Sequence, residues 1–253
     1  MTRSSPSEPL SDEGLLAAWE AGSGLPLPLR PIPLLAAADP GADPDALAAQ
    51  ALGACNARLL LLRKQLFGPR FEAVATCPAC GEALQLSLTA EALGAPAPDE
   101  SPPAPAGVTV DRDGYTLRLR PVTPLDLAVA EPLRDPTARR ACLLDRCLLA
   151  ADHDGEPVAA RDLPDAVQEA AGRALAQADP LAVFGLDVAC AACDHEWTAP
   201  LDLAAFLWAD LDRWARRLMR DVHALARAYG WTEAAVLALP PRRRCHYLHL
   251  AYG

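Results

Sequence analysis

The chain has 253 residues, a formal net charge of −10, and a composition that is 51% hydrophobic but only 5% aromatic. It is long enough to bury a substantial core as one large domain or two small ones. The acidic balance disfavours nucleic acid as a partner, because phosphate binding needs a concentrated basic surface. No apolar run reaches the roughly 18 residues of a membrane span, and residues 1–10 lack the apolar region of a secretory signal. We therefore expect a cytoplasmic protein that has no membrane partner.

The abundance of Ala and Leu favours helices, since these residues have high helix propensities. We predict three parts. An N-terminal helix and a Pro-rich strap cover residues 1–40, helices and two cysteine-bearing hairpins cover residues 41–201, and a helical C-terminal segment covers residues 202–253. Residues 94–107 are rich in Pro and Ala and are interpreted as a flexible linker.

Ser11 is positioned to cap a first helix that runs to about residue 21. Alternating prolines over residues 25–33 then predict an extended segment, because proline removes backbone donors and restricts the preceding residue. This segment is interpreted as a strap over the core, and a polyproline ligand for another protein is the alternative. The next helix is expected to start at Asp43 or Asp45 and to run to about residue 66.

Local signals also place the later elements. The dipeptide Asp113-Gly114 lies between alternating apolar residues and predicts a β-hairpin. This hairpin either joins the cysteine-bearing hairpins or lies in the insertion between them. Thr123 is expected to cap a short helix that starts at Pro124. Further helices are expected at about residues 136–150, 163–177 and 202–229, and after Thr232 and Pro240.

Two short cysteine pairs lie far apart in the chain. Each pair has C-x-x-C spacing between alternating apolar residues, which predicts two β-hairpins with cysteines at their turns. One pair supplies half of a tetrahedral site, and a structural zinc ion requires four ligands. We predict that one structural zinc ion is bound by Cys77, Cys80, Cys190 and Cys193. The two hairpins would then form a split zinc ribbon.

Other chemistry at these cysteines is disfavoured. A thioredoxin-like dithiol needs a C-x-x-C at the start of a helix in a βαβ unit, and neither pair has that context. A catalytic zinc ion needs an open coordination position, which four thiolates do not leave. His195 is an alternative ligand to Cys193, although the spacing favours the cysteine. The sequence contains no nucleophile elbow, H-E-x-x-H motif or phosphate loop, so we do not expect an enzyme.

Residues 202–253 carry eight Arg and five acidic residues, although the whole chain is acidic. Arginine and aromatic residues, both enriched at protein interfaces, gather in this segment. A solvated helix face is the alternative interpretation of the arginines. We predict that a protein partner contacts Trp208, Trp214, Tyr229, Trp231, Arg243, Arg244 and Tyr247.

Four segments carry a family resemblance. They are FGPRFEAVATCPACGEALQLSL around the first cysteine pair, LRPVTPLDLAVA, CAACDHEWTAPLDLAAFLW at the second pair, and VHALARAYGWTEAAVLALPPRRRCHYLHL near the C-terminus. In this order they resemble the T-even-type phage baseplate hub assembly protein family, which has relatives in contractile injection systems. The resemblance covers roughly residues 45–253. The second pair departs from the CPxCG form of the first, with Ala191 and Asp194 in place of Pro and Gly.

The resemblance implies a non-enzymatic assembly factor, a chaperone or adaptor, that binds baseplate or hub proteins of a contractile tail. The alternative hypothesis is a zinc-ribbon protein that is associated with nucleic acid or has a regulatory binding role, and the acidic charge disfavours it. The expected fold is α+β and mainly helical, with a split zinc ribbon made of two cysteine-tipped hairpins from distant segments.

Overall fold

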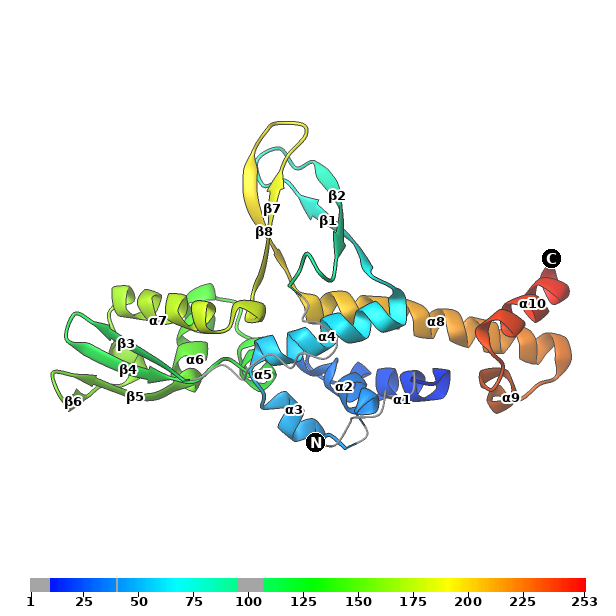
Figure 1. Cartoon of the computed structure of the whole chain (residues 1–253), viewed down its shortest axis with the longest axis horizontal. Helices are drawn as coiled ribbons and strands as arrows, with labels where there is room; N and C mark the ends of the chain where they lie inside the picture. Colours follow the sequence, from blue (N-terminus) through cyan, green and yellow to red (C-terminus); the bar gives the residue numbers. More distant parts are fainter. Residues whose placement is uncertain (1–9, 40, 95–106) are drawn as a thin grey trace.

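The computed structural model describes residues 10–39, 41–94 and 107–253, and it shows an α+β protein in which helices predominate (Figure 1). This confirms the expected α+β class. The predicted linker at residues 94–107 lies almost entirely outside the described residues. A helix with the length and the apolar composition of a membrane span does not occur among the described residues.

The elements follow one another in a simple order along the chain. The helices are α1 (Asp12–Ser23), α2 (Ile32–Ala38), α3 (Pro44–Ala48), α4 (Leu52–Phe67), α5 (Pro124–Ala130), α6 (Pro136–Cys147), α7 (Asp165–Ala178), α8 (Leu203–Tyr229), α9 (Glu233–Leu237) and α10 (Pro241–Tyr252). The short 3₁₀ turns are η1 (Leu27–Leu29), η2 (Ala160–Asp162) and η3 (Pro180–Ala182). The strands are β1 (Arg70–Thr76), β2 (Ala83–Thr89), β3 (Val108–Arg112), β4 (Tyr115–Leu119), β5 (Leu148–His153), β6 (Glu156–Pro157), β7 (Phe184–Ala189) and β8 (Glu196–Leu201).

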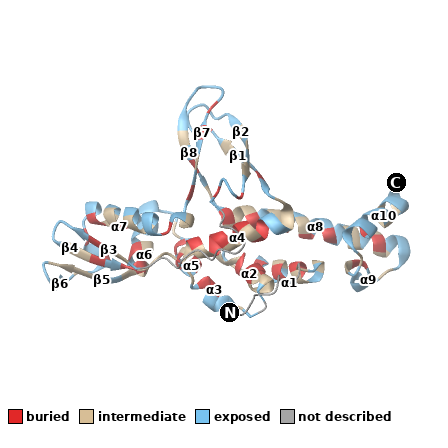
Figure 2. Ribbon diagram, viewed as in Figure 1, coloured by how far each residue is buried: buried red, intermediate tan, exposed pale blue. Residues whose placement is uncertain are grey.

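A central helical body holds the larger hydrophobic cluster, to which α1, α2, α4 and the first half of α8 contribute (Figure 2). Leu35 and Leu60 are almost completely buried there. The long helix α8 starts at Asp202, whose side chain accepts a hydrogen bond from the backbone N–H of Ala205 at 3.0 Å. It ends at Gly230, which has the left-handed φ of 69° that glycine adopts without strain. Helix α8 therefore joins the body to the C-terminal helices at the far end of the molecule (Figure 1).

A second hydrophobic cluster forms a lobe at the other end of the molecule (Figure 1). The antiparallel sheet β3-β4-β5-β6 packs there against α7, with Leu117 and Val167 fully buried between them. The hairpin at Asp113-Gly114 is confirmed, and it belongs to this sheet and not to the cysteine-bearing hairpins. The helix expected at residues 136–150 ends at Cys147, because the next residues pair with β4 as strand β5.

The cysteine-bearing hairpins β1–β2 and β7–β8 are separate two-stranded sheets that project from the central body (Figure 1). Only their bases are packed into the body, through residues such as Phe71 and Phe184. An isolated two-stranded hairpin is at best marginally stable in water. The outer parts of these hairpins therefore need a further contact, which the cysteines can supply.

The Pro-rich segment is not extended, so that prediction is wrong. Residues 27–29 form η1, and residues 32–38 form α2. Pro28 and Pro33 occupy the second position of their turns, where a helical N–H has no partner and proline is tolerated. Burial of Leu34 and Leu35 in the central cluster favours the helix over an extended strap.

The helix expected from Asp43 or Asp45 to residue 66 is in fact two helices, α3 and α4. Ala51 is extended, with ψ of 138°, and separates them. The start of α4 is held by distant groups: Leu52 N–H donates to Val122 O at 2.8 Å, and Gly53 N–H donates to the buried carboxylate of Asp179 at 2.9 Å. These tertiary bonds interrupt a pattern that is continuous in the sequence.

A buried carboxylate joins α5 to the lobe. Asp126 is completely buried, and its oxygens accept hydrogen bonds from Arg120 at 2.6 and 2.9 Å and from Arg146 at 2.7 Å. Thr123, which caps α5 as predicted, donates to the same carboxylate from its backbone N–H and its hydroxyl. Burial opposes ionisation of Asp126, but the bonds from Arg120 and Thr123 outweigh it and hold the pKa of Asp126 far below its usual range.

Candidate metal centre

The same turn forms the tip of each projecting hairpin. In the first, Cys77 N–H donates to the carbonyl five residues later at 2.8 Å, and Gly81 N–H donates to Cys77 O at 2.9 Å. The second repeats both bonds at 2.9 Å, from Cys190 N–H to His195 O and from Asp194 N–H to Cys190 O. The two turns therefore present their cysteines with the same local backbone arrangement.

The residue after the second cysteine of each pair is left-handed. Gly81 has φ of 79°, and Asp194 has φ of 55° at the matching position. Glycine adopts this conformation freely, and aspartate is among the few other residues that tolerate it. Replacement of the expected glycine by Asp194 thus leaves the second turn intact.

The four sulfur atoms meet between the two tips. Cys77 Sγ lies 3.7 Å from Cys193 Sγ, and Cys80 Sγ lies 3.6 Å from Cys190 Sγ. All four sulfurs lie within 4.8 Å of one another. A disulfide requires about 2.05 Å, whereas sulfurs bound at about 2.3 Å to one tetrahedral ion are about 3.8 Å apart. The separations fit a shared metal ion and do not fit disulfides.

The surroundings of the sulfurs shift the pKa values of the thiols in different directions. Burial opposes ionisation of Cys77, but the backbone N–H groups of Cys80 and Ala79 and the neighbouring thiols lower the pKa of Cys77 to about 7. The His195 N–H favours the Cys193 thiolate, yet the adjacent sulfurs raise the pKa of Cys193 to about 12. Four negative sulfurs at these distances repel one another, so their full ionisation requires a cation among them.

The other candidate ligands and cysteines lie elsewhere. The ring of His195 stacks against Trp197, with centroids 6.0 Å apart, and His195 is not part of the sulfur cluster. Cys55 and Cys147 are buried in the two hydrophobic clusters, and burial raises the pKa of each thiol to about 11. Within the described residues, the metal-ligating group therefore consists of the four predicted cysteines.

Comparison with known proteins does not assign the chain to a family. No protein-family model, curated protein or solved structure matches the chain. The resemblance to baseplate hub assembly proteins stays a prediction from sequence motifs, and the centre is interpreted from its own residues.

The base of the first hairpin is held by an arginine that the sequence pattern did not reveal. Arg63 on α4 pairs with Asp210 on α8 at 3.1 Å, and both side chains are almost fully buried. Its guanidinium lies 4.1 Å from the centre of the Phe71 ring, and it also donates to the carbonyls of Gly68 and Arg70. The only signal in the sequence is a single arginine after four consecutive leucines.

The structure excludes Trp208 from the predicted partner surface. Trp208 is 8% exposed and belongs to the central cluster. A Cβ atom at Gly22 would approach its ring to 2.7 Å, and the Arg30 guanidinium lies 5.5 Å from the ring centre. Trp214 is half-buried and packs against the same cluster. Trp208 is covered by Gly22 of α1 and by Arg30, and both α1 and η1 contact α8.

Arg244 is also internal, contrary to the prediction. Only 7% of its side chain is exposed, and its Nη1 lies 2.7 Å from the Asp12 carboxylate. Its Nε lies 3.9 Å from Asp221. Arg244 therefore ties α10 to α1 and α8, while the neighbouring Arg243 is exposed.

The remaining predicted aromatic residues form one cluster at the C-terminal end of the molecule. Tyr229 stacks on Trp231 with centroids 4.8 Å apart, and Tyr247 meets the edge of Trp231 at 4.9 Å. The Tyr229 hydroxyl donates to Tyr247 O at 3.3 Å. Tyr229 is exposed, and Trp231 and Tyr247 are half-buried. We call these three residues, together with exposed Arg243, the C-terminal surface.

Arg244→Ala is expected to lower the free energy of unfolding by about 2 kcal/mol, because it removes the buried ion pair with Asp12 and the weaker one with Asp221. Arg243→Ala, the matched control, is expected to change it by less than about 0.5 kcal/mol. Urea unfolding followed by circular dichroism measures both. Equal stability of the two variants would contradict the internal role of Arg244.

Proposed function

We propose that the protein is a non-enzymatic binding factor whose two projecting hairpins are joined into a split zinc ribbon by one structural zinc ion. The observation that carries the proposal is the convergence of four sulfurs from two hairpins whose facing cysteines are 110 and 116 residues apart in the chain. A tetrahedral set of four sulfurs binds zinc or iron. Zinc is the usual ion of closed structural sites.

The ligand set supports a structural role over a catalytic one. A catalytic zinc ion keeps a coordination position for water or substrate. Four thiolates fill every position of a tetrahedral ion, so a bound metal ion has none left for chemistry. The ion would instead hold together two hairpins that are each marginal alone.

The charge of the hairpins weighs against the nucleic-acid alternative. Residues 70–89 and 184–201 contain one arginine, at position 70, and no lysine. Their acidic residues are Glu72, Glu82, Asp187, Asp194 and Glu196. A ribbon that bound nucleic acid would need basic groups facing the phosphates.

We assign the partner contact to the C-terminal surface and the biological role to assembly of the baseplate hub of a contractile tail. The surface has the composition of an interface, with clustered aromatic rings beside an arginine. Helix α10, which carries Tyr247 and Arg243, also bears Leu250 and Tyr252, whose exposed fractions are 63% and 64%. The motif resemblance supplies the identity of the partner, a baseplate or hub protein.

Affinity purification from cells that assemble a contractile tail tests this function. The full chain is expected to recover a baseplate or hub component that mass spectrometry identifies. The double variant Trp231→Ala, Arg243→Glu is expected to recover at least about tenfold less, a loss of about 1.4 kcal/mol. Arg161→Glu, a charge reversal at a side chain that is 86% exposed in the lobe, is the control. Recovery of no tail component by the unaltered chain would refute the assembly role.

A further inference from the structure

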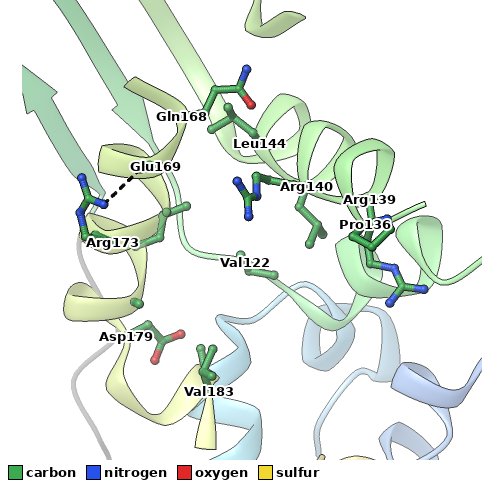
Figure 3. A pocket seen from close by; sticks show the side chains of 15 residues that line it. Val122, Pro136, Arg139, Arg140, Leu144, Gln168, Glu169, Arg173, Asp179 and Val183 are labelled. Atoms are coloured by element: carbon green, nitrogen blue, oxygen red, sulfur yellow. Dashed lines mark ion pairs between the residues drawn. The ribbon is translucent and has the colours of Figure 1, made fainter. Parts of the chain in front are cut away.

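A cavity of about 600 Å³ lies between α6 and α7, where the lobe meets the segment that leads into the second hairpin (Figure 3). Its lining is largely apolar and includes Val122, Leu144, Leu175 and Val183. Val183 is 68% exposed although it is a large apolar residue. This volume falls within the range of specific binding pockets, which occur preferentially where two structural units meet.

Three arginines border the cavity although the chain as a whole is acidic. The guanidinium of Arg140 points into the space between the two helices (Figure 3). Among the described residues, Arg140 has no carboxylate within ion-pair distance. Arg139 donates to Leu133 O at 2.8 Å, and Arg173 forms an exposed ion pair with Glu169 at 3.6 Å. Arg140 is therefore a cation that points into the cavity and is available to a ligand.

The carboxylates that line the cavity do not cancel this charge. Glu169 pairs with Arg173 on its own helix. Asp179 accepts a hydrogen bond from Gly53 N–H at 2.9 Å and belongs to the contact between η3 and α4. Burial raises the pKa of Asp179, although the hydrogen bond from Gly53 opposes this shift. The cavity therefore combines an apolar lining with an arginine that has no carboxylate partner. This combination complements a ligand with an apolar face that is flanked by carboxylates.

We propose that this cavity binds an amphipathic helix of a partner protein, with apolar side chains inserted between α6 and α7 and a carboxylate paired with Arg140. Helices that dock in grooves use apolar residues at positions i, i+3, i+4 and i+7. The cavity is open to solvent on one side, so a helix can approach it from outside. This contact adds a second binding site to the proposed function, and it does not depend on the C-terminal surface or on the contractile-tail assignment.

Fluorescence anisotropy of the full chain with a labelled peptide of about 16 residues tests the proposal. The probe has Leu along one face and Glu along the other. Saturable binding is expected, and Arg140→Glu and Val183→Glu are each expected to weaken it by at least about tenfold. Both residues are exposed, so the variants are expected to fold. The control Arg161→Glu, on a side chain that is 86% exposed, is expected to change the affinity by less than about twofold.

Two control peptides test whether binding depends on the amphipathic pattern of the peptide or only on its charge. A peptide with the same composition in scrambled order and a peptide with Lys in place of Glu are each expected to bind at least about tenfold more weakly. Hydrogen exchange with the Glu peptide is expected to slow in α6 and α7. Three results would overturn the proposal. They are no saturable binding up to about 1 mM, equal affinity for the scrambled peptide, and hydrogen exchange that slows in α8–α10 and not in α6 and α7. Dodecanoate, a fatty acid, is the competing small ligand. The proposal would also be overturned if dodecanoate displaced the peptide and Arg140→Glu left the affinity for the peptide unchanged.

These outcomes are separable from those of the proposed function. Failure of the peptide to bind leaves recovery of tail components through the C-terminal surface untouched. Conversely, a chain that recovers no tail component can still bind the acidic helix at Arg140.

Discussion

Cys190→Ser is expected to abolish stoichiometric zinc binding and to release the outer parts of both hairpins while the helical body stays folded. Cys190 Sγ is buried and lies 3.6 Å from Cys80 Sγ, so its loss removes one ligand and breaks the link between the tips. Metal affinity is expected to fall by more than about 100-fold. Because each hairpin is two-stranded, neither is stable once the ion is lost.

Hydrogen exchange with metal analysis measures this result. Amide exchange is expected to accelerate in the outer parts of residues 70–89 and 184–201. It is expected to stay unchanged in α4 and α8, whose side chains belong to the central cluster. Cys245→Ser, which alters an exposed cysteine outside the sulfur cluster, is the matched control and is expected to behave like the unaltered chain. Full zinc content and unchanged exchange in Cys190→Ser would contradict the shared site.

Asp126→Asn is expected to lower the free energy of unfolding by about 3 kcal/mol at pH 7. The substitution keeps the size of the side chain but removes the charge that Arg120 and Arg146 face. Loss of one partner from a buried ion pair typically costs about 3–5 kcal/mol. The lower end applies because both arginines are about one-third exposed. Asp145→Asn, at an exposed position on α6, is the control.

The effect of Asp126→Asn on the free energy of unfolding is expected to depend on pH. The folded-state pKa of Asp126 is depressed, so its contribution is fully present above the unfolded-state pKa of about 3.9 and is lost as pH falls below that value. The difference between Asp126→Asn and the unaltered chain is therefore expected to shrink between pH 5 and pH 3, measured by urea unfolding. A deficit of the same size at both pH values would show that the carboxylate charge is not its cause.

Local patterns in the sequence predicted the two cysteine-tipped hairpins, and the four cysteines were correctly expected to meet. The C-x-x-C spacing and the alternating apolar residues placed both cysteine-tipped hairpins correctly. The convergence of the four sulfurs followed from the coordination number of zinc and not from any contact visible in the sequence. The caps at Ser11 and Thr123 were also predictable, because a cap bonds to a residue only three positions away. The Thr123-x-x-Asp126 spacing is itself a capping-box signal, but it does not reveal the arginines that also bond to the Asp126 carboxylate.

Features that depend on distant partners were not predictable from local patterns. The interruption between α3 and α4 depends on Val122 O and the Asp179 carboxylate, which lie far along the chain. Arg244 is one of three consecutive arginines in the sequence, and its burial beside Asp12 is a tertiary contact that this local pattern does not show. The cavity below Arg140 is formed by two helices whose facing surfaces the sequence does not pair. These sites depend on tertiary packing, which overrides local propensity.

X-ray absorption at the zinc edge of the purified full chain tests the central claim most directly. We expect one zinc ion per chain, surrounded by four sulfurs at about 2.3 Å. The same spectrum is expected from Cys245→Ser, whose cysteine lies outside the cluster. The split zinc ribbon would be contradicted by a nitrogen ligand at about 2.0 Å or by iron in place of zinc. It would also be contradicted if the chain held no metal while both hairpins remained ordered.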